Sequence, residues 1–153
     1  ILFNTCCVRE NAEHKTFGNV GALRKLKDEN RNLMVAVCGC MMQQEDVAQK
    51  LSKTFPFIDI IFGTHNIHML ADMVGECILE KKRVLAIQDA DMSIHENVPV
   101  TRRTWPLASV NIMYGCNNFC TYCIVPYVRG REKSRSVQEI THTAEEVRIL
   151  RVC

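Results

Sequence analysis

The 153-residue chain has a globular composition, with 47% hydrophobic residues, 24% charged residues and a formal net charge of +2 at pH 7. This balance excludes a disordered tail or a polycationic arm, so contact with nucleic acid would have to rest on a local basic patch. No apolar run approaches the roughly 20 residues of a membrane-spanning helix, and no secretory signal opens the chain. We therefore expect a cytoplasmic protein with no membrane partner, whose nine cysteines serve metal binding or catalysis rather than disulfides.

The first part of the sequence alternates short apolar runs with segments of helical spacing. The apolar runs, which predict buried strands, are 1–3, 33–38, 58–62 and 84–87. Apolar residues that recur every three to four positions predict the intervening helices, over 10–29, 44–54 and 67–80. Strands that alternate with helices predict an α/β fold with a parallel sheet.

A polar segment bounded by prolines, 89–106, predicts a linker between two domains. We therefore assign a first domain to 1–88 and a second to 107–153. In the second domain, the apolar run 107–113 predicts a strand, a cysteine-rich loop follows, and apolar residues at helical spacing from Val137 onward predict a helix.

Both ends of the sequence lie inside predicted elements. The chain opens without methionine in the middle of an apolar run, and it stops inside the last predicted helix with no capping residue. We expect a piece of a longer protein that has no turnover of its own.

The predicted loop of the second domain contains the motif CxxxCxxC, formed by Cys116, Cys120 and Cys123. Such short spacing allows one loop to supply three thiolates to a 4Fe-4S cluster, which leaves one iron open. A structural zinc site takes four closed ligands, often as two separated CxxC pairs, and fits this pattern less well. An iron–sulfur centre is therefore the favoured interpretation, with zinc or redox thiols as alternatives.

This motif, with the aromatic Tyr122 before the last cysteine, resembles that of the radical SAM enzymes. The resemblance implies that Cys116, Cys120 and Cys123 hold a 4Fe-4S cluster whose open iron binds S-adenosylmethionine (SAM). It also implies that the reduced cluster cleaves SAM to a 5′-deoxyadenosyl radical, and that Tyr122 packs near the adenine of SAM.

Two further cysteine motifs, NTCCVRE at 4–10 and CGCMMQQ at 38–44, each follow a predicted strand. Loops at the carboxyl ends of parallel strands line one crevice, so these motifs are expected to converge. Cys40, beyond Gly39, is better placed as a ligand than Cys38 within its strand. Spacing alone leaves open which of Cys6 and Cys7 faces the crevice, because neighbours on an extended chain point to opposite sides.

Placed upstream of CxxxCxxC, the motifs NTCxVRE and GCMxQ resemble those of the radical SAM methylthiotransferases, most closely the MiaB-type tRNA enzymes. The resemblance implies a flavodoxin-like N-terminal domain, here without its first strand region, followed by the first strand, loop and helix of a radical SAM partial TIM barrel. In that family three cysteines of the first domain hold an auxiliary 4Fe-4S cluster, and Cys6 and Cys40 match two of them.

By the same resemblance, the intact enzyme adds a methylthio group to carbon 2 of N6-isopentenyl-adenosine beside the anticodon of tRNA. Two SAM molecules are consumed, and an electron donor such as a flavodoxin or ferredoxin reduces the clusters. Sibling families act on threonylcarbamoyl-adenosine in tRNA or on a ribosomal protein, and Arg9 and Glu10 favour the MiaB type. Glu10 could instead have a purely structural role, because a carboxylate in the first turn of a helix interacts favourably with the helix dipole.

The basic run RGREKSR follows the cysteine loop directly. Its cations could neutralise RNA phosphates, a contact that weakens as salt rises, or they could line a solvated linker. The residues in question are Arg129, Arg131, Lys133 and Arg135.

Two alternatives from other functional classes stay open at this stage. A zinc-stabilised RNA-binding module would use the cysteines without catalysis, and a ferredoxin-like carrier would hold a closed cluster that ignores SAM.

Overall fold

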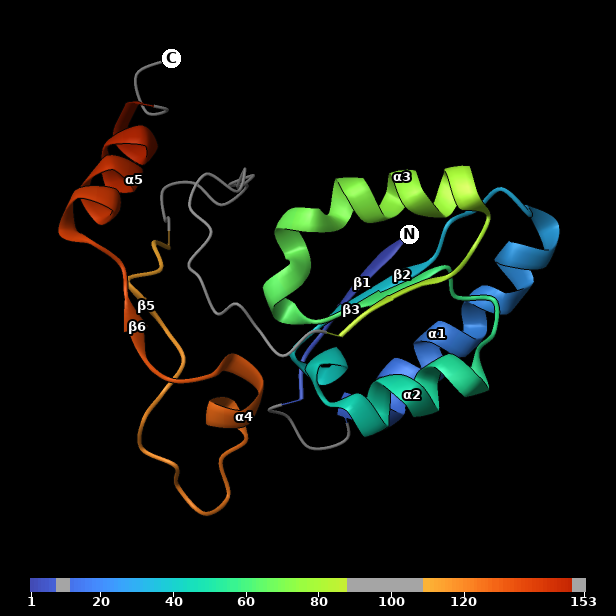
Figure 1. Ribbon diagram of the computed structural model, residues 1–153, viewed down its shortest axis with the longest axis horizontal. Helices are drawn as coiled ribbons and strands as arrows, with labels where there is room; N and C mark the ends of the chain where they lie inside the picture. The colour runs from blue at the N-terminus through green and yellow to red at the C-terminus, as the bar shows by residue number, and fades with distance from the viewer. Residues whose placement is uncertain (8–11, 88–108, 150–153) are drawn as a thin grey trace.

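The computed structural model describes residues 1–7, 12–87 and 109–149, which form an α/β unit and a smaller unit around the cysteine loop (Figure 1). The predicted linker, 89–106, lies outside the described residues, as do Arg9 and Glu10. Among the described residues, no helix is long and apolar enough to cross a bilayer.

The α/β unit is built on four parallel strands in the order β1-β2-β3-β4, which confirms the predicted parallel sheet. Their bounds are β1 Leu2–Thr5, β2 Ala36–Gly39, β3 Ile60–Phe62 and β4 Val84–Ala86. Each strand pairs with the next one along the chain, with Thr5 opposite Gly39 and Cys38 opposite Phe62. Parallel neighbours need long crossovers, and here each crossover contains a helix.

Helices cover both faces of this sheet (Figure 1). The helices α1 (Ala12–Glu29) and α2 (Glu45–Thr54) lie on one face, and α3 (Leu70–Glu80) lies on the other. Two short 3₁₀ helices, η1 (Cys40–Gln43) and η2 (Thr64–Met69), follow β2 and β3 directly. All three predicted helices are confirmed, and α2 ends just before Pro56, which has no N–H to continue a helix.

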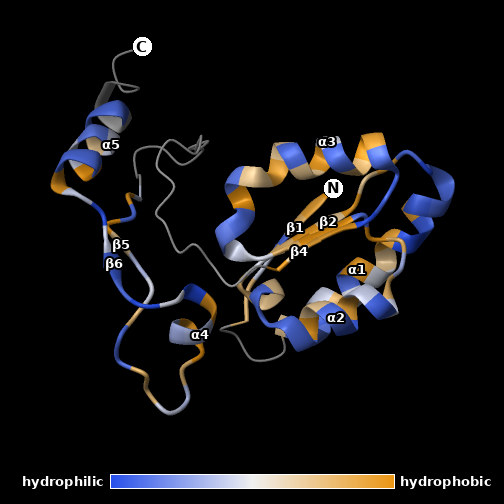
Figure 2. Cartoon of the chain, in the orientation of Figure 1, coloured by the Kyte–Doolittle hydropathy of each residue, from blue (hydrophilic) through white to orange (hydrophobic). Residues whose placement is uncertain are grey.

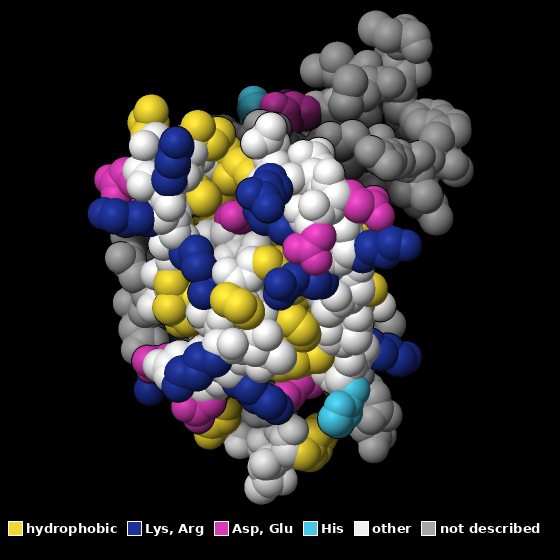
Figure 3. Space-filling model, turned by 90° about the vertical axis from the view of Figure 1, so that its right-hand side faces the viewer, with side chains coloured by type: hydrophobic (Ala, Val, Ile, Leu, Met, Phe, Trp, Pro, Cys, Tyr) yellow, Lys and Arg dark blue, Asp and Glu magenta, His cyan; other side chains and the backbone are white. Residues whose placement is uncertain are grey.

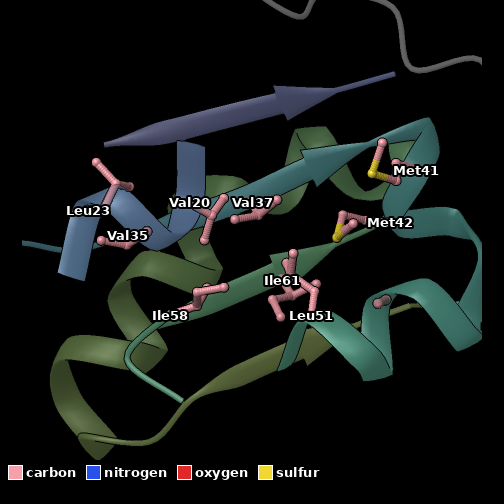
Figure 4. Close-up of a cluster of buried hydrophobic side chains, with 10 residues drawn as sticks. Val20, Leu23, Val35, Val37, Met41, Met42, Leu51, Ile58 and Ile61 are labelled. Carbon is pink, nitrogen blue, oxygen red and sulfur yellow. The ribbon is translucent and has the colours of Figure 1, made fainter. Parts of the chain in front are cut away.

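Side chains of the central strands alternate between two apolar clusters, as the period of a strand requires. Val35, Val37 and Ile61 point toward α1 and α2, where they pack with Val20 and Leu51 (Figure 4). On the opposite face, Met73 of α3 packs with a second set of strand side chains, Ala36, Cys38, Ile60 and Phe62. A sheet buried on both faces explains why the strands read as continuous apolar runs (Figure 2).

A half-buried ion pair ties the end of α1 to the start of two strands. Lys27 Nζ lies 2.7 Å from Asp59 Oδ2 and donates to the carbonyl of Leu33 at 2.6 Å. The same Asp59 oxygen accepts the backbone N–H of Val35 at 2.8 Å. One carboxylate therefore fixes a helix, the start of β2 and the start of β3 together.

The second unit contains β5 (Met113–Tyr114), α4 (Val125–Arg129), β6 (Lys133–Ser134) and α5 (Val137–Ile149). The predicted helix is confirmed as α5. Residues 109–112 do not join a strand, and β5 pairs with β6 in antiparallel fashion. The sequence pattern missed α4 and β6 because a one-turn helix and a two-residue strand are too short to show a period.

Candidate functional site

The carboxyl ends of β1 and β2 bring together the cysteines of the two upstream motifs. The backbone N–H of Cys7 donates to Cys40 Sγ at 3.0 Å, and Cys40 Sγ lies 3.6 Å from the carbonyl oxygen of Thr5. The Thr5 hydroxyl in turn donates to the carbonyl of Cys38 at 2.6 Å. The expected convergence of NTCCVRE and CGCMMQQ at one edge of the sheet is thus observed.

Gly39 makes this close approach of the two strands possible. Its φ of 105° lies in the left-handed region that L side chains rarely adopt. A Cβ built there would clash with the carbonyl oxygen of Thr5. The backbone can therefore turn directly after β2 and set Cys40, the first residue of η1, against the end of β1.

The three thiols at this edge differ in exposure. Cys6 is exposed, Cys7 is half-buried, and Cys40 is buried. Burial raises the pKa of Cys7 to about 12, and the hydrogen bond and charge of Cys40 and the charge of Cys6 act in the same direction. A protein without metal therefore keeps Cys7 as a neutral thiol at neutral pH, because burial disfavours the charged thiolate.

Cys38 and Cys77 lie away from this edge, on the face of the sheet that α3 covers. Cys38 is a buried member of the cluster beneath α3, and burial raises its pKa to about 11. Cys77, in α3, packs against the same cluster, and burial raises its pKa as well. Both pack as small apolar residues of the core.

Hydrogen bonds donated by two backbone N–H groups close the cysteine loop at its base. The N–H of Cys116 donates to the carbonyl of Gly130 at 3.1 Å, and the N–H of Glu132 donates to Asn117 Oδ1 at 3.1 Å. At the far end of the loop, the N–H of Cys123 donates to the carbonyl of Cys120 at 2.9 Å, which forms a tight turn. The fold therefore confines the three thiols to one closed loop.

The donor set of this loop suits an iron–sulfur cluster. Cys116 and Cys123 are half-buried, Cys120 is exposed, and none forms a disulfide. Within 1–7, 12–87 and 109–149, no three His, Cys, Asp or Glu side chains lie close enough to hold a metal ion. The loop holds three thiols, which would have to move closer together to bind the predicted cluster.

A cleft of about 340 Å³ lies beside the two cysteine groups, and Cys7 is the one cysteine in its described lining. Ile124, directly after Cys123, lines it together with Cys7 and Met41, and α4 packs against η1 beside it. The remaining lining comes from Ala12, Glu13 and His14 at the start of α1 and from Gln44, which follows η1, and all of these except Ala12 are polar. Sequence reasoning did not select these residues, because side chains of helix starts carry no distinctive spacing.

Tyr122 and the basic residues lie on the outside of the loop. Tyr122 is 92% exposed, and Arg129, Arg131 and Lys133 are exposed as well. Arg135 is half-buried, and its guanidinium donates to the carbonyl of Asn111 at 2.9 Å and to the Thr143 hydroxyl at 3.0 Å. These bonds give Arg135 a structural part in joining the segment before β5 to α5, whereas Arg129 and Arg131 are exposed side chains.

Positive and negative side chains are intermixed on one face of the molecule. Over the face seen in Figure 3, Lys and Arg side chains lie among Asp, Glu and apolar side chains. The stretch Arg129–Lys133 differs, since Glu132 is its single acidic residue.

Comparison with known proteins gives matches along nearly the whole chain. Residues 1–63 match the model of a family described as "Uncharacterized protein family UPF0004". The chain is 55% identical over 147 residues to the tRNA-2-methylthio-N(6)-dimethylallyladenosine synthase of Clostridium tetani, which covers 96% of this chain and 32% of that protein. The synthase of the same name from Clostridium botulinum (strain Hall) is 57% identical over 140 residues, 92% of this chain and 31% of that protein.

These matches confirm the resemblance to the methylthiotransferases that the cysteine motifs predicted. The chain spans about a third of the length of the curated relatives it matches.

Proposed function

We propose that this chain is part of a tRNA methylthiotransferase, which adds a methylthio group to carbon 2 of N6-isopentenyl-adenosine beside the anticodon. The names of its relatives, at 55% to 57% identity, support this substrate class. The observation that carries the proposal is the shared cleft, because Cys7 from the end of β1 and Ile124 from the cysteine loop line one space.

Each cysteine group has its own part in this proposal. Cys116, Cys120 and Cys123 would hold the cluster that binds SAM, and Cys6 and Cys40 would hold the auxiliary cluster. When bound, these clusters supply the electron for SAM cleavage and the site of sulfur transfer. Of the metal-bearing alternatives, zinc would require four closed ligands, and the loop offers three.

The protein's own residues position this chemistry. Gly39 and Thr5 fix Cys40 at the edge of the sheet, and the N–H of Cys7 donates to its sulfur. Such a donor stabilises negative charge on sulfur and so favours a thiolate ligand at Cys40. Ile124 and Met41 contribute apolar side chains to a lining that is otherwise mainly polar.

In this proposal tRNA is the macromolecular partner, and a flavodoxin or ferredoxin supplies electrons. Tyr122 is placed beside the adenine of SAM, and the exposed cations Arg129, Arg131 and Lys133 are placed near RNA phosphates. The cytoplasm, where tRNA is modified, is the proposed compartment.

Cysteine substitutions in the intact protein test the two parts separately. After anaerobic reconstitution with iron and sulfide, Cys120→Ala should abolish SAM cleavage, measured as 5′-deoxyadenosine. Cys40→Ala should keep SAM cleavage and lose methylthio transfer, measured by mass spectrometry of tRNA nucleosides. Unchanged cleavage in Cys120→Ala, or recovery of a colourless zinc protein, would refute the proposal.

The substrate is tested in cells that lack the protein. Their tRNA should contain isopentenyl-adenosine without the methylthio group. If the methylthiolated nucleoside persists in full, the substrate belongs to one of the sibling families.

A further inference from the structure

Three side chains of the cysteine loop, Phe119, Tyr127 and Arg131, come together on its outer surface. The ring centroids of Phe119 and Tyr127 lie 5.9 Å apart, with an interplanar angle of 87°. The guanidinium carbon of Arg131 lies 6.0 Å from the centroid of the Phe119 ring. The fold thus assembles an aromatic pair and a cation from positions that are separated in the sequence.

This cluster is open to solvent. Phe119 is 45% exposed and Tyr127 is 72% exposed. An edge-to-face pair uses the edge of one ring and one face of the other, so further ring surface stays available to a flat group. The aromatic pair Phe17 and Phe55 differs, because both of its side chains are half-buried and pack against the main core.

The backbone holds Phe119 in an unusual conformation. Its φ of 46° lies in the left-handed region, which bulky residues rarely occupy. Such conformations persist where the surrounding structure imposes them, and they concentrate at binding sites. Phe119 lies between the closed base of the loop at Cys116 and the turn from Cys120 to Cys123.

The charge around the cluster is positive. Arg129 and Arg131 are exposed on either side of Gly130, and Glu132 is the one acidic residue in the adjoining stretch. Aromatic rings beside cations bind unpaired bases of nucleic acids, because the rings stack on the base and the cations neutralise phosphates.

We propose that Phe119, Tyr127 and Arg131 form a stacking site for an unpaired RNA base. The site rests on the proposed function, since it assumes RNA as the substrate, and it adds where on the chain RNA is bound. Its place on the loop that carries Cys120 would anchor a base next to the one that reacts. A nucleobase is also present in SAM, so the experiment has to separate these two sources.

Binding of a fluorescent RNA hairpin with an unpaired loop, measured by anisotropy in the intact protein, tests the site. Tyr127→Leu and Phe119→Leu should each weaken hairpin binding about tenfold, the range found for loss of one stacked base. Tyr127→Phe, which keeps the ring, should bind within about twofold of the original protein. Leu79→Ala, at an exposed position of α3, is the matched control, and its affinity should not change.

Salt dependence separates stacking from charge. The leucine variants should keep the slope of log affinity against log salt, whereas Arg131→Gln should reduce it by up to about 0.7, the value for one phosphate contact with a single strand. A fully paired duplex of the same stem should bind equally well to the original protein and to Tyr127→Leu, because its bases are not free to stack.

Several results would overturn the site. The original protein could fail to bind the hairpin, or Tyr127→Leu could bind it as tightly as the original. A loss of thermal stability in both leucine variants, with hairpin affinity retained, would assign the rings to packing. Weakened binding of SAM alone, measured by equilibrium dialysis, would place the adenine of SAM there instead.

SAM cleavage, measured in the same preparations, tests the proposed function separately from the stacking site. A protein that cleaves SAM but whose leucine variants retain hairpin affinity contradicts the stacking site alone. A protein that never cleaves SAM contradicts the function.

Discussion

The α/β unit and the cysteine-loop unit are stabilised in different ways. Of the seventeen buried hydrophobic residues in the part of the chain that the structure describes, sixteen lie in the α/β unit, and Val128 is the remaining one. Within 109–146, Pro126 and Val128 are the buried residues. The cysteine loop is held by hydrogen bonds such as those of Asn117 and Arg135.

This contrast indicates that the two units have different requirements for stability. A unit with two apolar clusters can hold the sheet edge that presents Cys40 without help, because burial supplies its stability. A loop with so little core depends on bonds to its own backbone and, in the proposed enzyme, on its cluster. Metal binding to such a loop contributes folding free energy directly.

The largest expected effect is on chemistry, from Cys120→Ala in the intact protein. SAM cleavage should fall below detection, because the cluster loses one of three ligands. Unfolding of the α/β unit, followed by circular dichroism in urea, should shift by less than about 0.5 kcal/mol, as for most surface changes. A large loss of α/β stability would show that the two units are not independent.

Next in size is the core substitution Leu51→Ala, whose side chain is fully buried between α2 and the sheet. It should lower the free energy of unfolding by about 3 kcal/mol, through lost burial and the cavity left behind. Leu79→Ala, at an 85% exposed position, is the control and should change it by less than about 0.5 kcal/mol. Equal effects at the two positions would contradict the described core.

Loss of the ion pair between Lys27 and Asp59 should lower the free energy of unfolding by somewhat less. Asp59→Ala leaves the Lys27 ammonium and the Val35 N–H without their carboxylate, which should cost about 2 kcal/mol of unfolding free energy. The double variant Lys27→Met/Asp59→Ala removes the orphaned charge and should recover part of this loss. If the double variant loses as much unfolding free energy as the two single variants together, or more, the direct pair is contradicted.

The smallest effect concerns the hydrogen bonds within the cysteine-loop unit. Arg135→Met removes the bonds to Asn111 and Thr143 and should destabilise the start of α5 by about 1 kcal/mol. Hydrogen exchange of the amides near Glu139 should then quicken about fivefold, while amides of β2 and β3 keep their rates. Faster exchange in the sheet as well would mean that the two units unfold together.

Sequence reasoning succeeded where the signal is local. Strands buried on both faces read as apolar runs, and amphipathic helices show their period, so the elements of the α/β unit were predictable to within a few residues. It fell short for β5, β6 and α4, whose lengths are below any period, and for the cleft residues Glu13 and Gln44, which become neighbours only through folding.

The sequence by itself determined the parallel α/β architecture and the grouping of three cysteines in one loop, because both depend on residue spacing along a continuous stretch. Only the tertiary structure decided that Cys7 donates its N–H to Cys40, and that Phe119, Tyr127 and Arg131 share one surface. These contacts depend on strand register, on the turn at Gly39 and on the path of a closed loop. Residue spacing encodes none of these, since each is fixed by contacts between distant parts of the chain.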